Sequence, residues 1–176
     1  MWRHVYWMEK GIKAGSDMQE APMEITITSA VFTPDKPIPV KYTGQGENIS
    51  PDLSWRDTPD GIASFALVCD DPDAPAGTWV HWTIWNMPAT STGLAQGVST
   101  NASLPDGSVQ GVTSRGTSGY HGPMPPHGNA HRYYFRIYAL DTVLSLPASA
   151  NRTQLDAAMR GHILSQGQLM GTYQRQ

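Results

Sequence analysis

Cysteine is almost absent from this sequence of 176 residues, in which Cys69 is the single one. It cannot form an internal disulfide bond, and nothing in the sequence requires an oxidising compartment. Cys69 ends the apolar segment 65–69, where a buried thiol that packs as a small hydrophobic side chain is a better interpretation than a nucleophile. The scarcity of cysteine therefore excludes a disulfide scaffold and gives no support to cysteine catalysis.

Long apolar segments and clusters of basic residues are missing as well. No stretch is long and apolar enough to span a bilayer, and the N-terminal segment lacks the continuous apolar core of a signal peptide. The net charge of −3 is spread along the chain, and scattered arginines argue against nucleic-acid binding. We therefore expect a cytoplasmic protein with no nucleic-acid partner and no transmembrane segment.

The common catalytic and metal-binding motifs are also absent. The sequence contains no Gly-rich phosphate loop, no nucleophile elbow and no zinc-ligand spacing. Asp71, Asp73, His81 and His131 are of residue types that can bind a divalent cation. Without the spacing of a metal motif, we predict no metal and no cofactor.

The chain divides near Met23. Residues 1–22 mix charges, glycine and aromatic side chains with no clear period, and we expect an extension that is disordered or non-native. An alternative is that its aromatic residues dock on the domain or on a partner. The alternating segment 24–28 predicts a first strand, so the folded domain is expected to cover residues 23–176.

The 17 glycines and 14 prolines mostly interrupt the region up to residue 146, which favours antiparallel sheets joined by loops. The clearest predicted strands are 63–69, 79–87 and 132–141. Segment 88–129 is dominated by loops, and loops of that length in a compact domain are usually functional or disordered.

One helix is predicted near the C-terminus. Leu155, Met159 and Ile163 recur at four-residue spacing on one face, and either Asn151 or Thr153 can cap the first turn. A glycine at position 167 would end the helix, and residues 169–173 would form a short final strand.

Candidate binding residues lie beside the proline- and glycine-rich segments. Prolines flank Asp71 and Asp73 and fix much of their backbone. His81 lies on a strand that is apolar on both faces, which predicts a central strand and a buried imidazole. His131 and Tyr133 share the inward face of the strand that follows residue 130. A buried imidazole needs a hydrogen-bond partner, and the two carboxylates are the nearest candidates.

Each of these residues also has a purely structural interpretation. A buried histidine is more often a core residue than a ligand-binding one, and Asp-Pro pairs are more often turns than sites. Taken together, however, two carboxylates and two imidazoles beside glycine- and proline-rich loops predict one small polar pocket for an anion or a polar head group. His121 and His127 lie in the long loop and are not expected to take part directly.

Four motifs together resemble those of the phosphatidylethanolamine-binding protein (PEBP) family, which includes the Raf kinase inhibitor protein. They are DPDAP at 71–75, WVHW at 79–82, GYHGPMPP at 119–126 and HRY at 131–133. Segments 49–55 and 138–141 make the bacterial and archaeal Raf kinase inhibitor-like type the nearer match. The resemblance covers residue 23 to the C-terminus.

The resemblance implies a mainly β, β-sandwich-like fold of two antiparallel sheets with one or two helices packed near the C-terminus. It also implies an anion pocket at one end of the larger sheet, which holds phosphate, acetate or a phosphoethanolamine-like head group, and pairing as a homodimer. The implied ligand-binding residues are Asp71, Asp73, Trp79, His81, Gly122, Pro123, His131 and Tyr133. Arg115 departs from the family pattern, which commonly has an aromatic residue there; it either adds a cation at the pocket mouth or faces solvent.

The expected function is therefore ligand binding rather than catalysis, with modulation of a kinase or another signalling partner as the further role. Protonated imidazoles would donate to the anion, and the nearby carboxylates would favour that charged form. The alternative is an acid–base enzyme, such as a hydrolase, a cyclase or a condensation catalyst, that forms no covalent intermediate. A third hypothesis, that loop 90–128 binds a protein partner, rests on family analogy alone.

Overall fold

The computed structural model describes residue 22 and residues 24–176. The proposed N-terminal extension and the docking of its aromatic residues therefore lie outside the described residues, apart from Pro22. Its carbonyl accepts hydrogen bonds from Ser165 Oγ and from the backbone N–H of Gln166, at 3.1 Å each.

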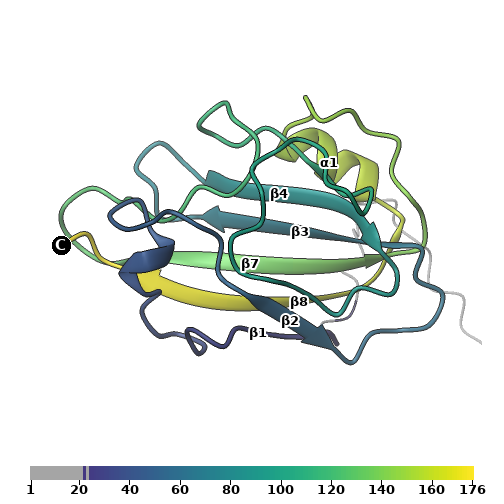
Figure 1. Ribbon diagram of the computed structural model, residues 1–176, viewed down its shortest axis with the longest axis horizontal. Coiled ribbons are helices and arrows are strands. Elements are labelled where there is room, and N and C mark those ends of the chain that lie inside the picture. Colours follow the sequence, from purple (N-terminus) through teal and green to yellow (C-terminus); the bar gives the residue numbers. More distant parts are fainter. Residues whose placement is uncertain (1–21, 23) are drawn as a thin grey trace, which may run out of the picture.

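Two antiparallel β-sheets make up most of the described chain (Figure 1). The smaller sheet has the order β1 (Thr26–Thr28), β2 (Leu53–Arg56) and β5 (Gly93–Leu94). The larger sheet has the order β6 (Val109–Gln110), β4 (Trp79–Pro88), β3 (Ser64–Asp71), β7 (His131–Leu140) and β8 (Ile163–Tyr173). A 3₁₀ turn (Val40–Tyr42) and helix α1 (Arg152–Met159) complete the fold. The predicted mainly β architecture with a helix near the C-terminus is confirmed.

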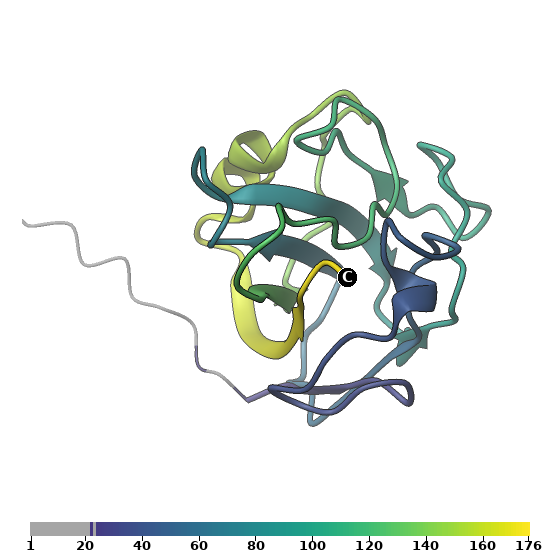
Figure 2. The same ribbon diagram turned by 90° about the vertical axis from the view of Figure 1, so that its left-hand side faces the viewer.

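Strand β3 is buried along its whole length because both faces of the larger sheet are covered. Its side chains alternate, so that Phe65, Leu67 and Cys69 pack into the core between the two sheets. Ala66 and Val68 pack on the opposite face, in a second core that includes residues of α1. Figure 2 shows α1 and the smaller sheet on different sides of the larger sheet. Cys69 is buried, as its apolar context predicted.

The three strands expected at 63–69, 79–87 and 132–141 correspond to β3, β4 and β7 within one or two residues. Segment 88–129 is mostly loop and contains only the two-residue strands β5 and β6. Its path over the larger sheet is fixed by hydrogen bonds to β4, such as that from the Gly111 N–H to the Thr83 carbonyl at 3.2 Å.

The helix prediction was right about its start and wrong about its end. Asn151 is the N-cap, in a reciprocal capping box with Gln154. The helix ends at Met159, and Gly161 then adopts a positive φ of 81° that turns the chain into β8. Ile163 consequently opens a strand instead of extending the helix face.

Gly167 does not end a helix but lies within β8, whose C-terminal half is the predicted final strand. A Cβ atom at this position would lie 2.0 Å from the carbonyl oxygen of Ile25. Glycine is therefore required by the close approach of the N-terminal segment to this strand.

The sheet topology brings the predicted site residues to one end of the larger sheet. Because β3 runs antiparallel to β4 and β7, its C-terminal end lies beside their N-terminal ends. Asp71 is thus in register with Trp79, and Asp70 with Tyr134. This end lies at the left of Figure 1 and faces the viewer in Figure 2. Within the described residues, no helix is long and apolar enough to cross a membrane.

Candidate functional site

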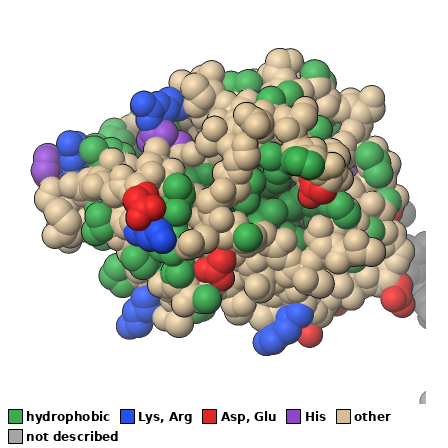
Figure 3. All heavy atoms as spheres, viewed as in Figure 1, with side chains coloured by type: hydrophobic (Ala, Val, Ile, Leu, Met, Phe, Trp, Pro, Cys, Tyr) green, Lys and Arg blue, Asp and Glu red, His purple; other side chains and the backbone are tan. Residues whose placement is uncertain are grey.

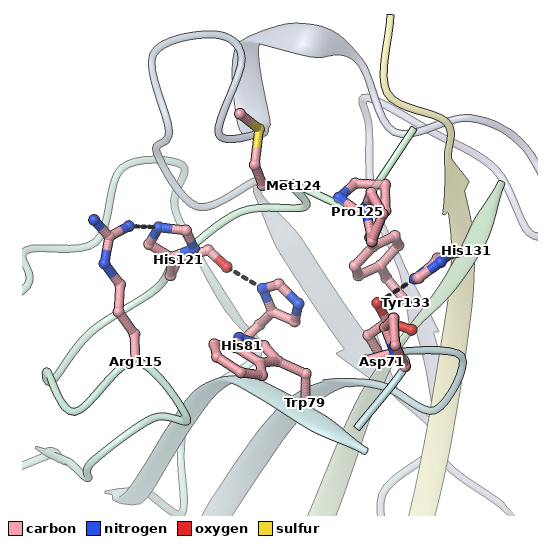
Figure 4. Close-up of a pocket in the computed structure, with 12 residues that line it drawn as sticks. Asp71, Trp79, His81, Arg115, His121, Met124, Pro125, His131 and Tyr133 are labelled. Atoms are coloured by element: carbon pink, nitrogen blue, oxygen red, sulfur yellow. Dashed lines mark hydrogen bonds and ion pairs between the residues drawn. The ribbon is translucent and has the colours of Figure 1, made fainter. Parts of the chain in front are cut away.

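A pocket of about 320 Å³ opens at this end of the larger sheet. Five of the residues predicted from the sequence line it: Asp71, Trp79, His81, His131 and Tyr133 (Figure 4). The other lining residues come from the β3–β4 connection and from the long loop: Ala74, Pro75, Arg115, His121, Met124, Pro125 and Pro126. Asp71 and His131, which are 60 residues apart in the sequence, thus meet in one hollow.

Asp71 and His131 form a pair at one side of the pocket. The Nδ1 atom of His131 donates to Oδ2 of Asp71 at 2.7 Å, and only 4% of the Asp71 side chain is exposed. The other carboxylate oxygen accepts the backbone N–H of Asp73 at 2.8 Å. With both oxygens engaged, Asp71 fixes the orientation of the imidazole ring, and Nε2 is left as the ring's second polar atom.

His81 has a different partner from the one expected. Its Nδ1 atom lies 2.6 Å from the carbonyl oxygen of His121 rather than beside a carboxylate. A carbonyl can only accept, so Nδ1 carries a proton and Nε2 is the atom that titrates. Burial lowers the pKa of His81 below its ordinary value, and this outweighs the opposing effects of the His121 carbonyl and of Asp71.

The nearby carboxylates favour the charged imidazole of His81, as expected, but burial outweighs them and the net shift of its pKa is downward. Above its lowered pKa the ring is neutral, and Nε2 presents a lone pair. In Figure 4 the ring edge that does not contact His121 is turned toward Tyr133 and Asp71. His81 thus offers the pocket a hydrogen-bond acceptor at neutral pH and a donor only in acid.

Tyr133 contributes an unpaired donor. Its side chain is fully buried, its ring lies edge-on to that of His81 with centroids 5.2 Å apart, and its hydroxyl has no hydrogen-bond partner among the described residues. Burial, followed by the negative charge of Asp71, raises the pKa of this hydroxyl far above its ordinary value. The hydroxyl therefore keeps its proton. The neighbouring Asp71 carboxylate adds to the raised pKa as a hydrogen-bond acceptor but does not reach normal hydrogen-bond geometry, so an acceptor that enters the pocket can pair with the hydroxyl.

His121 was not expected to take part directly, and the structure nevertheless places it in the pocket lining. It lines the pocket, its carbonyl fixes His81, and its Nε2 atom accepts a hydrogen bond from Arg115. Burial, and then the neighbouring guanidinium charge, lower the pKa of His121. Arg115 is at the pocket mouth, which decides between its two predicted placements. His127 is exposed and does not line the pocket.

Asp73 does not line the pocket. Its carboxylate accepts from Nε and NH2 of Arg132 at 2.9 and 2.7 Å, and also from the backbone N–H of that residue. These hydrogen bonds hold the pKa of Asp73 at about 2. Asp73 thus ties the β3–β4 connection to the start of β7 and supports the site from outside.

The sequence predicts Gly122 and Pro123 at the rim of the pocket, but neither residue lines it. The Gly122 N–H donates to Oδ1 of Asn48 at 2.8 Å, and a Cβ on this glycine would lie 2.3 Å from the Tyr42 carbonyl. The Pro123 carbonyl accepts the Gly44 N–H at 2.8 Å. These contacts position the next three residues, 124–126, which do line the pocket.

Large apolar side chains line the pocket together with its charged and polar groups. Of the four large hydrophobic side chains that are exposed among the described residues, two belong to it: Trp79 at 40% and Met124 at 41%. Figure 3 shows apolar side chains interspersed with basic ones and histidines at this end of the molecule.

Within the described residues, no cluster of three His, Cys, Asp or Glu side chains could hold a metal ion.

Sequence relatives place the chain among proteins found in archaea and bacteria. A UPF0098 protein of Methanothermobacter thermautotrophicus is 54% identical over 138 residues, which are 78% of this chain and 91% of the relative. A UPF0098 protein of Chlamydia muridarum is 44% identical over 154 residues, covering 85% and 98% of the two chains.

Solved structures and a family model agree with this placement. A PEBP homologue from Chlamydia trachomatis has a TM-score of 0.79 at 41% identity, covering 86% of this chain and 98% of that one. E. coli YbcL, described as a member of the mammalian PEBP family, has a TM-score of 0.81 at 30% identity, covering 87% and 99%. The model of the phosphatidylethanolamine-binding protein family matches residues 28–174. This chain belongs to the phosphatidylethanolamine-binding protein family.

Proposed function

We propose that this protein binds a small anion or a phosphorylated head group in the pocket beside β3, β4 and β7. The observation that carries the proposal is the buried Tyr133 hydroxyl, a donor with no partner among the described residues. An unsatisfied buried donor costs about 1–3 kcal/mol. An anionic oxygen inside the pocket would remove that cost.

The surroundings of the hydroxyl suit an anion of this size. Arg115 supplies a permanent positive charge at the mouth, and His131 is held by Asp71 with its Nε2 atom unengaged by that pair. Trp79 and Met124 form apolar walls against which the organic part of a head group can pack. The family's name supports a phosphoethanolamine-like group as one candidate, along with phosphate and acetate.

Binding is favoured over catalysis by what the pocket lining contains. None of the twelve described residues that line it is a serine, threonine, cysteine or lysine, which gives no support to covalent catalysis through a hydroxyl, a thiol or an amine of these residue types. The neutral His81 could still act as a general base, which keeps acid–base turnover as the second candidate. Modulation of a kinase or another signalling partner, a homodimeric state and a cytoplasmic location are proposed on family likeness and composition alone.

Calorimetric titration of the whole chain with inorganic phosphate and with O-phosphoethanolamine, between pH 5 and 8, tests the proposal. In Tyr133→Phe we expect affinity to fall about tenfold, because one charge-assisted hydrogen bond is lost. The same variant should be as stable as the parent or more stable, since an unpaired buried hydroxyl is removed.

Tyr173→Phe is the matched control, because the Tyr173 hydroxyl is paired with Gln45 at 2.6 Å and does not line the pocket. It should bind phosphate as the parent does. Absence of binding at every pH, or equal affinity in Tyr133→Phe and the parent, would defeat the proposal. Turnover of a ligand that His81→Gln abolishes would instead favour the acid–base enzyme.

A further inference from the structure

The peptide group that joins His121 to Gly122 is hydrogen-bonded on both of its sides. Its carbonyl oxygen, which belongs to His121, lies 2.6 Å from Nδ1 of His81 in the pocket wall (Figure 4). Its N–H, which belongs to Gly122, donates to Oδ1 of Asn48 at 2.8 Å. The C=O and N–H of a trans peptide group point in opposite directions, so the two partners together fix how this plane is turned.

Asn48 holds its side chain in place through its own backbone. The residue has a positive φ of 59°, a conformation that asparagine tolerates better than most side chains. Its N–H donates to the Lys41 carbonyl at 3.1 Å, which ties it to the 3₁₀ turn. Asn48 is not among the residues that line the pocket, so it reaches the site through the Gly122 N–H.

The backbone differs in freedom on the two sides of this peptide group. The His121 N–H donates to the His81 carbonyl at 3.0 Å, which holds the preceding peptide group. Gly122 follows, and a residue without a Cβ atom can adopt φ values that other residues avoid. Because Gly122 is buried, its N–H would be costly to leave unpaired. The Asn48 side chain therefore opposes a reversal of the plane that glycine would otherwise permit.

The orientation of this plane selects the tautomer of His81. A carbonyl only accepts hydrogen bonds, so Nδ1 of the neutral ring carries the proton and Nε2 has a lone pair. With the plane reversed, the Gly122 N–H would face the ring and Nδ1 would have to accept. The proton would then reside on Nε2, and the ring edge turned toward Tyr133 would donate instead of accept.

We propose that Asn48 is a positioning residue that sets the tautomer of His81 through the His121–Gly122 peptide group. By holding the Gly122 N–H it keeps the carbonyl turned toward Nδ1, and it thereby decides whether His81 presents an acceptor or a donor inside the pocket. The tautomer is a property of the protein without ligand, so the inference goes beyond the proposed function. Only its consequence for a ligand rests on that function.

NMR spectra that detect the ring nitrogens of histidine test this assignment, because protonated and unprotonated ring nitrogens differ in chemical shift. They are recorded on the whole chain at pH 8, where the lowered pKa of His81 leaves the ring neutral, and His81→Gln identifies the signals. We expect the Nδ1–H tautomer in the parent. Asn48→Gly accepts the positive φ but removes the side chain, so the ratio of Nδ1–H to Nε2–H should fall at least about fivefold, the effect of one hydrogen bond.

Two further variants separate this role from a general loss of stability. Asn48→Asp keeps an acceptor oxygen and tolerates the same φ, so it should retain the parent ratio within about twofold. Asn86→Gly is the matched control, because Asn86 also has a positive φ, of 57°, and lies toward the other end of β4. Its side chain donates to the Leu144 carbonyl at 2.9 Å and accepts the Leu144 N–H at 2.8 Å. Thermal unfolding should show a loss of stability in Asn86→Gly, with the His81 tautomer unchanged.

A pH titration of the same signals gives a second readout. Burial has the largest influence on the pKa of His81 and lowers it, while the hydrogen bond to the His121 carbonyl raises it. The titratable groups around the ring, which the substitution leaves in place, are Asp71, Asp70, Tyr133 and the ring of His121. Loss of the carbonyl contact in Asn48→Gly should therefore lower the pKa of His81 further, and the control variant should leave it unchanged.

An Nε2–H tautomer in the parent or in Asn48→Asp, or an unchanged Nδ1–H tautomer in Asn48→Gly, would overturn the inference. An equal shift in Asn86→Gly would do the same, since it would reflect a general loosening of the fold. Titration with inorganic phosphate keeps the two proposals apart. If the tautomer responds as expected but neither the parent nor any variant binds phosphate, the proposed function fails and this inference stands.

Discussion

Asp70 and Asp71 are adjacent on strand β3 and almost equally buried, at 4% and 3% exposed, yet they face opposite sides of the larger sheet. Asp70 faces the side covered by α1 and is paired with two arginines, Arg136 and, at 2.7 Å, Arg152. Asp71 faces the pocket and is paired with a histidine, His131. The difference lies in the partner rather than in the burial.

This comparison separates a carboxylate held in a cluster of arginines from one that lines the pocket. Arginine cannot lose its proton in a protein, so the cluster around Asp70 is locked in one charge state. Asp71 is bound to an imidazole, and this pair opens to a cavity instead of to packed side chains. Burial therefore does not distinguish the two carboxylates, whereas a partner that lines a pocket does.

The largest effect on the free energy of unfolding is expected from substitution of Asp70. Asp70→Asn leaves two arginines, 26% and 22% exposed, without their shared carboxylate. We expect a loss of about 3 kcal/mol in the free energy of unfolding, measured by urea denaturation. Asp156→Asn is the control, because Asp156 also pairs with Arg152 but is 46% exposed. It should cost under about 1 kcal/mol, and equal losses in the two variants would contradict this account.

Substitution of Asp71 should lower the free energy of unfolding less than substitution of Asp70, and it should also change the affinity for phosphate. In Asp71→Asn the amide oxygen still accepts from Nδ1 of His131, so the hydrogen bond is kept and we expect a cost of about 1 kcal/mol or less. Asp71→Ala removes the acceptor and frees the ring to rotate, which should weaken phosphate binding roughly tenfold. Calorimetry checks whether Asn retains the affinity that Ala loses; similar affinities in both variants would refute a positioning role.

Much of the fold and part of the site could be predicted from sequence, because their signals are local. The apolar run of β3 and the cap of the helix act on their own neighbours. The sequence identified the strand, and the structure selects Asn151 from the two predicted caps, Asn151 and Thr153. Asp71, His81 and His131 were brought together by the prediction because each lies at the end of a strand whose faces can be read from alternation. The antiparallel topology then fixes which strand ends meet.

What failed depends on contacts between distant segments. The four-residue spacing of Leu155, Met159 and Ile163 fits a helix, but Ile163 suits a strand equally well. The helix ends early because of the turn at Gly161 and the close approach of Ile25 to Gly167, which the local spacing does not show. His121 lies in a loop with no periodicity, so nothing in its neighbourhood shows that its carbonyl would meet Nδ1 of His81. The one available signal for His121 was its position in the motif GYHGPMPP at 119–126, which also contains the predicted site residues Gly122 and Pro123.

Asp73, a third carboxylate close to Asp70 and Asp71 in the sequence, should have the smallest effect on stability. It tests whether a more exposed ion pair contributes less than the buried pairs of the other two carboxylates. Asp73 is bound to Arg132 at the surface, and its pKa of about 2 in the folded state lies below the ordinary value of 3.8. The folded protein therefore binds fewer protons than the unfolded chain between these two values. The contribution of this carboxylate to stability is fully present above pH 3.8 and is lost as the pH falls through 2.

Asp73→Asn should accordingly be slightly less stable than the parent at pH 6, with phosphate affinity unchanged because the residue does not line the pocket. As the pH is lowered from 4 to 2, the difference between the two melting temperatures should shrink to a small remainder, since the parent carboxylate is about half protonated at pH 2 and its ion pair with Arg132 is weakened. Thermal unfolding across this range measures it, with Asp57→Asn, which is paired with Arg56 at the surface away from the pocket, as the control. A difference that persists undiminished at pH 2 would show that Asp73 acts through packing of the β3–β4 connection rather than through its charge.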